Sequence, residues 1–193
     1  MATIQHRDIT GDNIHEPKGA STALDGQVYR ADGTGSGDWM FPAGHAYGEL
    51  YIAAGATAQT LPASSATAKL NPTGEWTTNG SANVTLSAAN GTITVLQAGE
   101  YQLNFWITFT TAAISSGAKY NFYYAVNGTA AARKIIVVKT SNGADTIHCS
   151  GSGFSTLAAN DVISIYVGGD GTSSSTAITP LEAGFSLSLI DPT

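Results

Sequence analysis

Apolar and polar residues alternate with a period of two along most of this sequence, and this alternation restricts the fold more than any other feature. The run from Tyr101 to Thr110 shows it most clearly, because aromatic or aliphatic side chains occupy every second position. A half-buried β-strand has this period, whereas an amphipathic helix needs a period of 3.6 residues. The same alternation recurs at residues 120–126, 163–167 and 185–189. No segment carries a sustained helical period.

Short polar turns separate these runs, and Asn-Gly pairs occur at residues 79–80, 90–91, 127–128 and 142–143. Such pairs favour the tight turns of β-hairpins. We expect further strands at residues 49–53, 83–87, 91–97 and 146–149, a buried strand at 135–138, and a turn at 150–153. Many short strands joined by polar turns predict an all-β sandwich or barrel.

Charge is concentrated at the N-terminal end of the chain. Nine of the charged residues lie within the first 38 positions, where apolar residues are too sparse to build a core. We therefore expect residues 1–45 to form an extended or turn-rich arm that becomes ordered on a partner surface. A disordered tail is the alternative. The β pattern fills residues 46–193, which have the length of one domain.

Composition excludes several classes of function. The chain has a net charge of −6, and only 11% of its residues are charged, against about 25% in ordinary soluble domains. Such an acidic chain is not expected to bind nucleic acid, which requires clustered Lys and Arg. No stretch approaches the roughly 20 apolar residues of a membrane span, and the first residues do not resemble a signal peptide. The one cysteine, Cys149, excludes an intrachain disulfide and a thiolate-based zinc site.

No motif indicates catalysis, a cofactor or a metal centre. The acidic residues are isolated in sequence, the four histidines are scattered, and there is no Gly-x-Ser-x-Gly motif. The run from Asp32 to Asp38 alternates oxygen-bearing residues with glycines, as calcium loops do, but it lacks their terminal glutamate. A glycine-rich loop is the simpler interpretation. We therefore expect a protein that is not an enzyme and holds no cofactor or metal.

Two smaller features allow both a functional and a structural interpretation. His148 and Cys149 are neighbours, but adjacent residues of a strand point to opposite faces, which favours an inert, buried cysteine. Arg133, Lys134 and Lys139 form a small basic cluster. This cluster is either a solvated strand end or a contact to an acidic partner or a polysaccharide.

An ordered set of short motifs resembles the jelly-roll domain of the complement-globular-head and tumour-necrosis-factor superfamily. The motifs lie at Gly91–Val95, Ala98–Tyr101, Ala125–Gly128, Leu157–Ile163 and Gly184–Leu189. Asn160 stands where the family has glycine in its Leu-x-x-Gly-Asp-x-Val motif, and asparagine tolerates a left-handed backbone. The resemblance implies a jelly-roll β-sandwich. Another kind of sandwich, such as a generic viral jelly roll, is the alternative.

The resemblance also implies a homotrimer, because that family usually forms tight trimers. The β domain is rich enough in aromatic residues to cover a subunit interface as well as a core. We expect one of these two roles, trimer interface or core, for Tyr101, Phe105, Trp106, Phe109, Tyr120, Phe122, Tyr123, Tyr124 and Phe185. The alternative is that they all cover one end of the same sandwich.

The arm resembles the N-terminal segment of many tailed-bacteriophage fibre and decoration proteins. The resemblance rests on three motifs, at residues 6–9, 14–19 and 26–29, and on the glycine-rich run that ends at Trp39. In those proteins a short polar arm attaches a trimeric β domain to the particle. The resemblance implies that the residues that attach this chain to a capsid are His6, Arg7, Asp8, Ile9, Ile14, His15, Pro17, Lys18, Tyr29 and Trp39.

Together these patterns predict a non-enzymatic structural protein on the capsid surface of a tailed-phage virion. It would be a homotrimeric decoration (cement) or head-fibre protein, with the major capsid protein or another virion protein as its partner. The main alternative is a tail-fibre or tail-tip protein that binds a glycan or protein of the host surface. A polysaccharide hydrolase and a cellular jelly-roll ligand are further alternatives.

Overall fold

The structure is a computed structural model that describes residues 22–31, 37–42, 45–62, 66–72, 74–111, 118–140, 146–169 and 177–192. The chain divides into two compact units, Met1–Pro42 and Ala43–Thr193. The described part contains β-strands and no α-helix, so none of it forms a helix long and apolar enough to cross a membrane. The predicted arm at residues 1–45 corresponds mostly to the first unit, and its first 21 residues lie outside the described ranges.

The described part of the first unit is a β-hairpin. Strands β1 (Val28–Ala31) and β2 (Gly37–Met40) pair in antiparallel register, with Tyr29 opposite Trp39. Gly37 permits this close pairing, because a Cβ at that position would collide with the carbonyl oxygen of Arg30. At these residues the arm is therefore a paired ribbon rather than a single extended segment.

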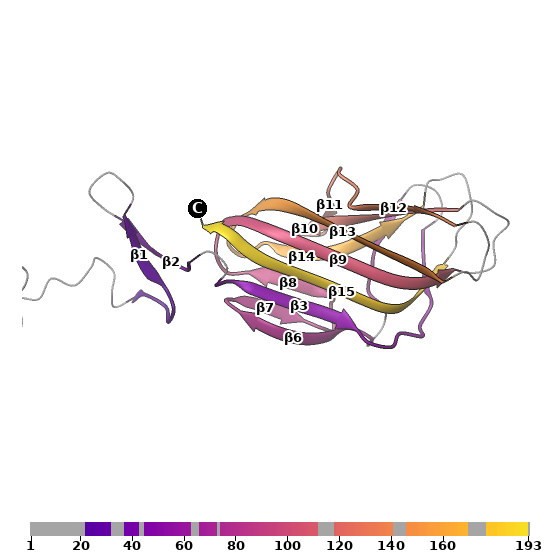
Figure 1. Cartoon of the computed structure of the whole chain (residues 1–193), viewed down its shortest axis with the longest axis horizontal. Coiled ribbons are helices and arrows are strands. Elements are labelled where there is room, and N and C mark those ends of the chain that lie inside the picture. Colours follow the sequence, from indigo (N-terminus) through magenta and orange to yellow (C-terminus); the bar gives the residue numbers. More distant parts are fainter. Residues whose placement is uncertain are drawn as a thin grey trace, which may run out of the picture. The chain divides into compact units, whose positions relative to one another are not determined.

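The second unit is a sandwich of two antiparallel sheets (Figure 1). The strands of one, called here the β10 sheet, are β5 (Thr67–Lys69), β7 (Val84–Ser87), β8 (Thr92–Val95), β10 (Lys119–Val126), β11 (Thr129–Ala130), β12 (Ile136–Lys139) and β14 (Val162–Gly168). Those of the other, called the β9 sheet, are β3 (Tyr47–Ile52), β4 (Gln59–Thr60), β6 (Thr77–Ala82), β9 (Gly99–Thr111), β13 (Ile147–Leu157) and β15 (Ala177–Pro192).

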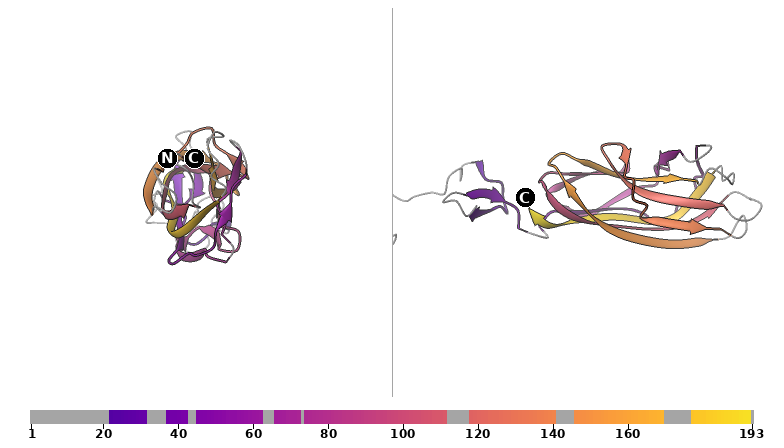
Figure 2. Two further views of the ribbon diagram at one scale, coloured as in Figure 1. Left: turned by 90° about the vertical axis from the view of Figure 1, so that its right-hand side faces the viewer. Right: turned by 90° about the horizontal axis from the view of Figure 1, so that it is seen from above.

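Strands that are distant in sequence lie side by side in both sheets. The β10 sheet has the order β11-β10-β14-β8-β7, with β12 beside β10 and β5 beside β14. The β9 sheet has the order β13-β9-β15-β3-β6, with β4 beside β15. Figure 1 shows the long strands β9, β13 and β15 running along the domain, and the right-hand view of Figure 2 shows the same domain from above. This order confirms the predicted all-β sandwich with crossing connections.

The core lies between the two sheets and follows from the period of two. Along β9 the inward residues from Tyr101 to Phe109 are almost fully buried, and the residues between them are mostly more exposed. Phe105 of β9 meets Phe122 of β10 across the sandwich, with ring centroids 5.5 Å apart. Aromatic side chains from both sheets therefore fill the interior at close contact.

Two of the expected sequence motifs meet at one corner of the fold. Asn127 and Gly128 form the two-residue turn between β10 and β11, with φ angles of 51° and 80°. The Asn127 side chain donates a hydrogen bond to the Asp161 carboxylate at 2.7 Å and accepts one from the Val162 N–H at 2.9 Å. Asn160 has a φ of 72°, which confirms the left-handed conformation expected where the family has glycine.

Three local predictions are wrong. Residues 150–153 lie inside β13 rather than in a turn, and the Asn-Gly pair at 79–80 lies inside β6. The run at 135–138 does form a strand, β12, but it is only partly buried, because Ile136 is buried whereas Val137 is 59% exposed. Each error has the same physical source: local residue type indicates turn or core, but pairing with distant strands decides the outcome.

Candidate assembly surfaces

The described residues of the first unit bring together two of the predicted attachment residues. The rings of Tyr29 and Trp39 lie on paired strands and meet edge to face, with centroids 5.5 Å apart. The Gln27 amide donates a hydrogen bond to the Trp39 carbonyl at 3.3 Å and so ties the start of the hairpin to its second strand. The other predicted attachment residues lie outside the described ranges: His6, Arg7, Asp8, Ile9, Ile14, His15, Pro17 and Lys18.

This hairpin leaves apolar surface uncovered. All four residues of β1 are exposed, and Leu24, Val28 and Tyr29 are among the large apolar side chains open to solvent. A two-stranded ribbon is only marginally stable alone, and both of its strands are edge strands. Both properties suit a segment that completes its structure by pairing or packing against another surface.

The structure places most of the predicted aromatic cluster in the core of the protomer. Seven members are buried: Tyr101, Phe105, Phe109, Tyr120, Phe122, Tyr124 and Phe185. Phe109 contacts both Tyr120 and Phe122 edge to face, at centroid distances of 5.3 and 5.7 Å. These seven fill the sandwich, so they leave only Trp106 and Tyr123 on outer faces.

The outer face of the β9 sheet carries aromatic residues in two rows. Strand register places Phe154 of β13, Gln102 of β9, Ser188 of β15 and Tyr47 of β3 side by side. Phe154 is 62% exposed and Tyr47 45% exposed.

The second aromatic row lies four residues along β9 from the first. It contains Trp106 of β9, which is 41% exposed, and Tyr51 of β3, with Ser150 and Gly184 in the same row. The row between the two holds polar residues: Ser152, Asn104, Ser186 and Glu49. A flat face with large aromatic residues among small polar ones is the composition of a protein–protein interface core.

Gly184 leaves room for the Trp106 indole on this face. A Cβ at residue 184 would lie 2.6 Å from Trp106 Cε2 and would collide with Nε1. The indole therefore lies across β15 in space that only glycine leaves free. Tryptophan is among the residues that most often anchor protein–protein interfaces, which favours Trp106 in that role.

On the same face, Ser152 is not positioned for nucleophilic catalysis by His148. His148 is exposed, and its Nδ1 shares a hydrogen bond of 2.9 Å with the hydroxyl of Thr108. Ser152 lies four residues further along β13, roughly 13 Å away at the rise of a β-strand. The spacing separates the serine from the histidine that would have to activate it.

Cys149 faces the other side of β13 and is half-buried rather than fully buried. Burial raises the pKa of its thiol to about 11, so the thiol is protonated and weakly nucleophilic at neutral pH. Within the described ranges, no three His, Cys, Asp or Glu residues group closely enough to hold a metal ion. The possible calcium loop at residues 32–38 lies mostly outside those ranges.

No model of a protein family matches this sequence, and no curated protein matches it either. Solved structures do resemble its fold. The TNF Eiger of S. frugiperda aligns with a TM-score of 0.51 at 10% identity, over 77% of this chain and 95% of that one. The domain is a jelly roll.

Two further structures align over the same share of this chain. The globular domain of the zebrafish complement 1qA protein has a TM-score of 0.47 at 15% identity, and the vertex protein P5 of PRD1 has 0.45 at 16%. Each alignment covers 77% of this chain and 99% of the other. At these identities the likeness concerns the fold alone.

Sequence reasoning missed Phe154 and Tyr47 as surface aromatic residues. Phe154 follows a Ser-Gly segment whose residue types predict a turn, so local sequence does not reveal its place in an alternating strand. The alternation of Ser150, Ser152 and Phe154 with Gly151 and Gly153 is a period of two, but it uses small residues on the inward side. That period of two was the sequence signal that could have predicted a strand here and placed Phe154 on its outer face.

Proposed function

We propose that this chain is a non-enzymatic structural protein of a tailed-bacteriophage particle. It forms a homotrimer, either a capsid decoration protein or a head-fibre protein, and its N-terminal unit anchors it to the capsid surface. The observation that carries the proposal is the division into a jelly-roll domain and a separate unit whose hairpin exposes apolar side chains. The resemblance of the N-terminal motifs to phage decoration and fibre proteins supports the same role.

The outer face of the β9 sheet supports self-association. Tyr47, Trp106 and Phe154 are exposed on that face, whereas single surface apolar residues are usually scattered. Glu49 is the one charged residue within the two aromatic rows and the polar row between them. A second copy of the chain can cover this face without burying many charges.

The arm supports attachment. A hairpin with open edges can add its strands to a sheet edge of another protein, and its exposed Leu24 and Val28 can be buried there. Three arms on one trimer bind together, so each later arm engages at high effective concentration. Weak individual contacts then give stable attachment.

The test compares the full chain with a fragment of residues 43–193, which removes the first unit. Both proteins are added to particles that lack this protein, and bound protein is measured by sedimentation. We expect the full chain to bind and the fragment to remain in solution, although both are trimers. Undiminished binding by the fragment would reject the arm as the anchor.

Electron microscopy of the decorated particles then locates the protein. Density distributed over the head supports decoration or a head fibre. Density at the tail tip would replace the proposal with the receptor-binding alternative.

A further inference from the structure

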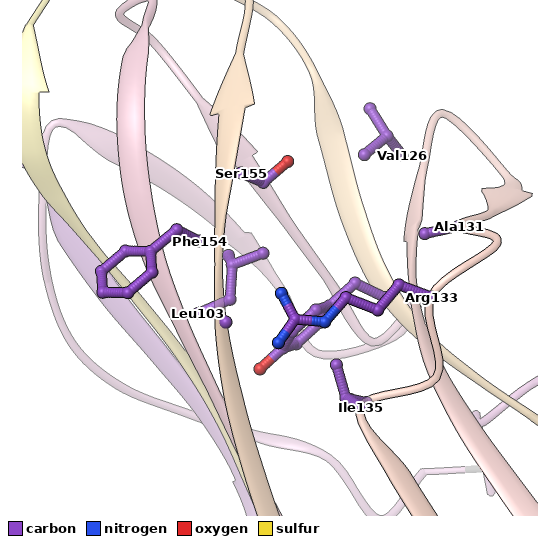
Figure 3. A pocket seen from close by; sticks show the side chains of 9 residues that line it. Leu103, Val126, Ala131, Arg133, Ile135, Phe154 and Ser155 are labelled. Atoms are coloured by element: carbon purple, nitrogen blue, oxygen red, sulfur yellow. The ribbon is translucent and has the colours of Figure 1, made fainter.

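A pocket of about 80 Å³ opens at the edge of the sandwich, where β13 faces the segment between β11 and β12. Figure 3 shows the Arg133 side chain extending across it, while the Phe154 ring points to the far side of its strand. The pocket therefore lies on the inward side of β13, opposite to the aromatic face described above.

One polar atom in this pocket lacks a partner. Tyr124 is only 6% exposed, and its buried hydroxyl has no hydrogen-bond partner among the described residues. The rest of the ring is well held, since it packs against Phe185 with centroids 6.2 Å apart. Buried polar groups are nearly always hydrogen-bonded, so this hydroxyl, which its neighbours close off from solvent, remains an unused donor at the base of the pocket.

A cation lies near the ring that carries this hydroxyl. A Cβ added to Gly153 would lie 3.8 Å from Tyr124 Cε2 and 3.9 Å from Arg133 Nη1, so both side chains approach that glycine. Burial raises the pKa of Tyr124, and the positive charge of Arg133 partly offsets this rise, so the two groups interact electrostatically. No acidic side chain of the described residues forms an ion pair with Arg133.

The remaining walls are mostly apolar and come from Leu103, Val126, Ala131 and Ile135, with the hydroxyl of Ser155 as a further polar group. A guanidinium and a phenol hydroxyl at one side of an apolar pocket match a carboxylate carried on a short aliphatic stem. The volume admits about five non-hydrogen atoms, judged by the space that one water molecule needs. Propionate has five.

We propose that the pocket between Arg133 and Tyr124 binds a carboxylate on a short aliphatic stem. The exposed Arg133 side chain turns its guanidinium to the carboxylate and donates to it, and the stem packs against Leu103, Val126 and Ile135. The Tyr124 hydroxyl, closed off in the ligand-free structure, donates to one carboxylate oxygen once Arg133 has turned. The source is either a free short-chain acid or the side chain of a glutamate on a protein partner. The inference does not rest on the proposed virion role.

Other anions fit less well. A phosphate is more strongly hydrated and offers oxygens on all sides, some of which would face apolar walls here. An acidic sugar would place most of its ring hydroxyls against the same walls without partners. A pocket with one cation and two hydroxyl groups among apolar walls therefore favours a monocarboxylate.

The experiment is a titration of the full chain with sodium propionate, followed by methyl NMR signals of Leu103, Val126 and Ile135. Sodium chloride at equal ionic strength is the reference. We expect saturable shifts with a millimolar dissociation constant, as suits a ligand of so few atoms. Propionamide, which has the same shape without the charge, should shift these signals at least tenfold less effectively.

Variants identify the groups that bind. Arg133→Gln should weaken propionate binding at least tenfold, and Tyr124→Phe should weaken it severalfold. Lys134→Gln is the matched control, because Lys134 is also an exposed cation next to Arg133 but does not line the pocket. Unchanged binding in Arg133→Gln, or equal shifts with propionamide, would overturn the proposal.

Two further ligands distinguish the source. A glutamate capped at both backbone ends should bind at least as well as propionate if the partner is a protein, and worse if the ligand is a free acid. Either result keeps the carboxylate site. If glucuronate binds more tightly than both propionate and the capped glutamate, and Arg133→Gln abolishes its binding, the site recognises a sugar acid. That result would overturn the proposal of a ligand with an aliphatic stem.

Discussion

Glu75 links two segments that the strands themselves do not connect. Its Oε1 accepts hydrogen bonds from the N–H groups of Ala56 at 2.8 Å and Thr57 at 2.7 Å, in the loop that follows β3. Burial alone would raise the pKa of Glu75, but the hydrogen bonds from Ala56 and Thr57 outweigh it and lower that pKa below 4.5. The charged carboxylate therefore stabilises the folded state more than the protonated form does.

The substitution Glu75→Gln tests this role. We expect it to reduce the free energy of unfolding by about 1 kcal/mol at pH 7, because an amide oxygen accepts the same hydrogen bonds more weakly and solvent screens the charge. Urea unfolding at a fixed protomer concentration measures the difference.

The pH dependence has a definite sign. Since folding lowers the pKa of Glu75, its charged form contributes stability above pH 4.5, and this contribution is lost as the pH falls through the folded-state value. The difference between the wild type and Glu75→Gln should thus be constant near neutral pH and shrink below pH 4.5. A difference that grows on acidification would contradict the assigned pKa direction.

At the scale of elements, the sequence predicted strands whose inward residues are large and missed those whose inward residues are small. The strands at 101–110 and 185–189 alternate bulky and polar residues, and both are correct within β9 and β15. Strand β13 alternates two serines with two glycines, which no local rule separates from a turn. At these positions its partner in β9 lies 44 to 50 residues away, and the pairing with β9 determines its conformation.

The glycines of β13 are needed where backbone approaches backbone. A Cβ at Gly151 would lie 2.5 Å from the Ile135 carbonyl oxygen, and the Ile135 N–H is held by a hydrogen bond to the Phe122 carbonyl at 2.9 Å. At Gly153 the nearest atom to an added Cβ is 3.8 Å away. Two glycines two residues apart on one strand thus differ in whether they can accommodate a Cβ.

Alanine substitution should separate these two glycines. We expect Gly151→Ala to destabilise the protein by about 1–3 kcal/mol, because the segment before β12 must move away from β13. Gly153→Ala should be neutral or stabilising by about 0.5 kcal/mol, since it reduces the freedom of the unfolded chain without a clash. Chemical unfolding of both variants measures the difference in the free energy of unfolding. An equal decrease in both variants would contradict the view that the room for an added methyl group distinguishes the two positions.

The candidate surfaces were predictable only in part, because strand pairing over long sequence distances decides which residues share a face. The period of two placed Trp106 on the outer face of its strand, opposite to Phe105 and Ile107. It could not show that Tyr47 of β3 and Phe154 of β13 share that face, because their alignment depends on register across four strands. Sequence patterns fix which way a residue points within a strand, and the sheet order fixes its neighbours.

At the scale of the whole molecule, the inward and outward faces of the β9 sheet differ in burial and, under the proposed function, in role. The inward side carries Phe105, which is almost fully buried against Phe122. The outward side carries Phe154, which is mostly exposed in a single protomer. The inward side makes each protomer fold, and the outward side, under the proposed function, holds the protomers together.

The same substitution on either side should therefore produce two different defects. Phe105→Asp removes a core ring and buries an unpaired charge, so we expect no folded protein. Phe154→Asp should change the stability of the protomer by less than about 0.5 kcal/mol, because the side chain is exposed before assembly. It should instead convert the trimer into monomers, because three carboxylates then enter the interface without partners.

Light scattering after size exclusion measures the outcome directly. The wild type should have three times the 19.8 kDa mass of the chain, and Phe154→Asp should have that of one chain while its circular dichroism stays that of a β-sandwich. Phe154→Ser serves as the milder variant, with an intermediate mass that falls on dilution. A trimer that persists in Phe154→Asp would place the interface elsewhere, and the face with Tyr123 would then be the next to substitute. A wild type that is itself monomeric would remove the trimer and leave attachment to depend on single arms, without the gain from multivalency.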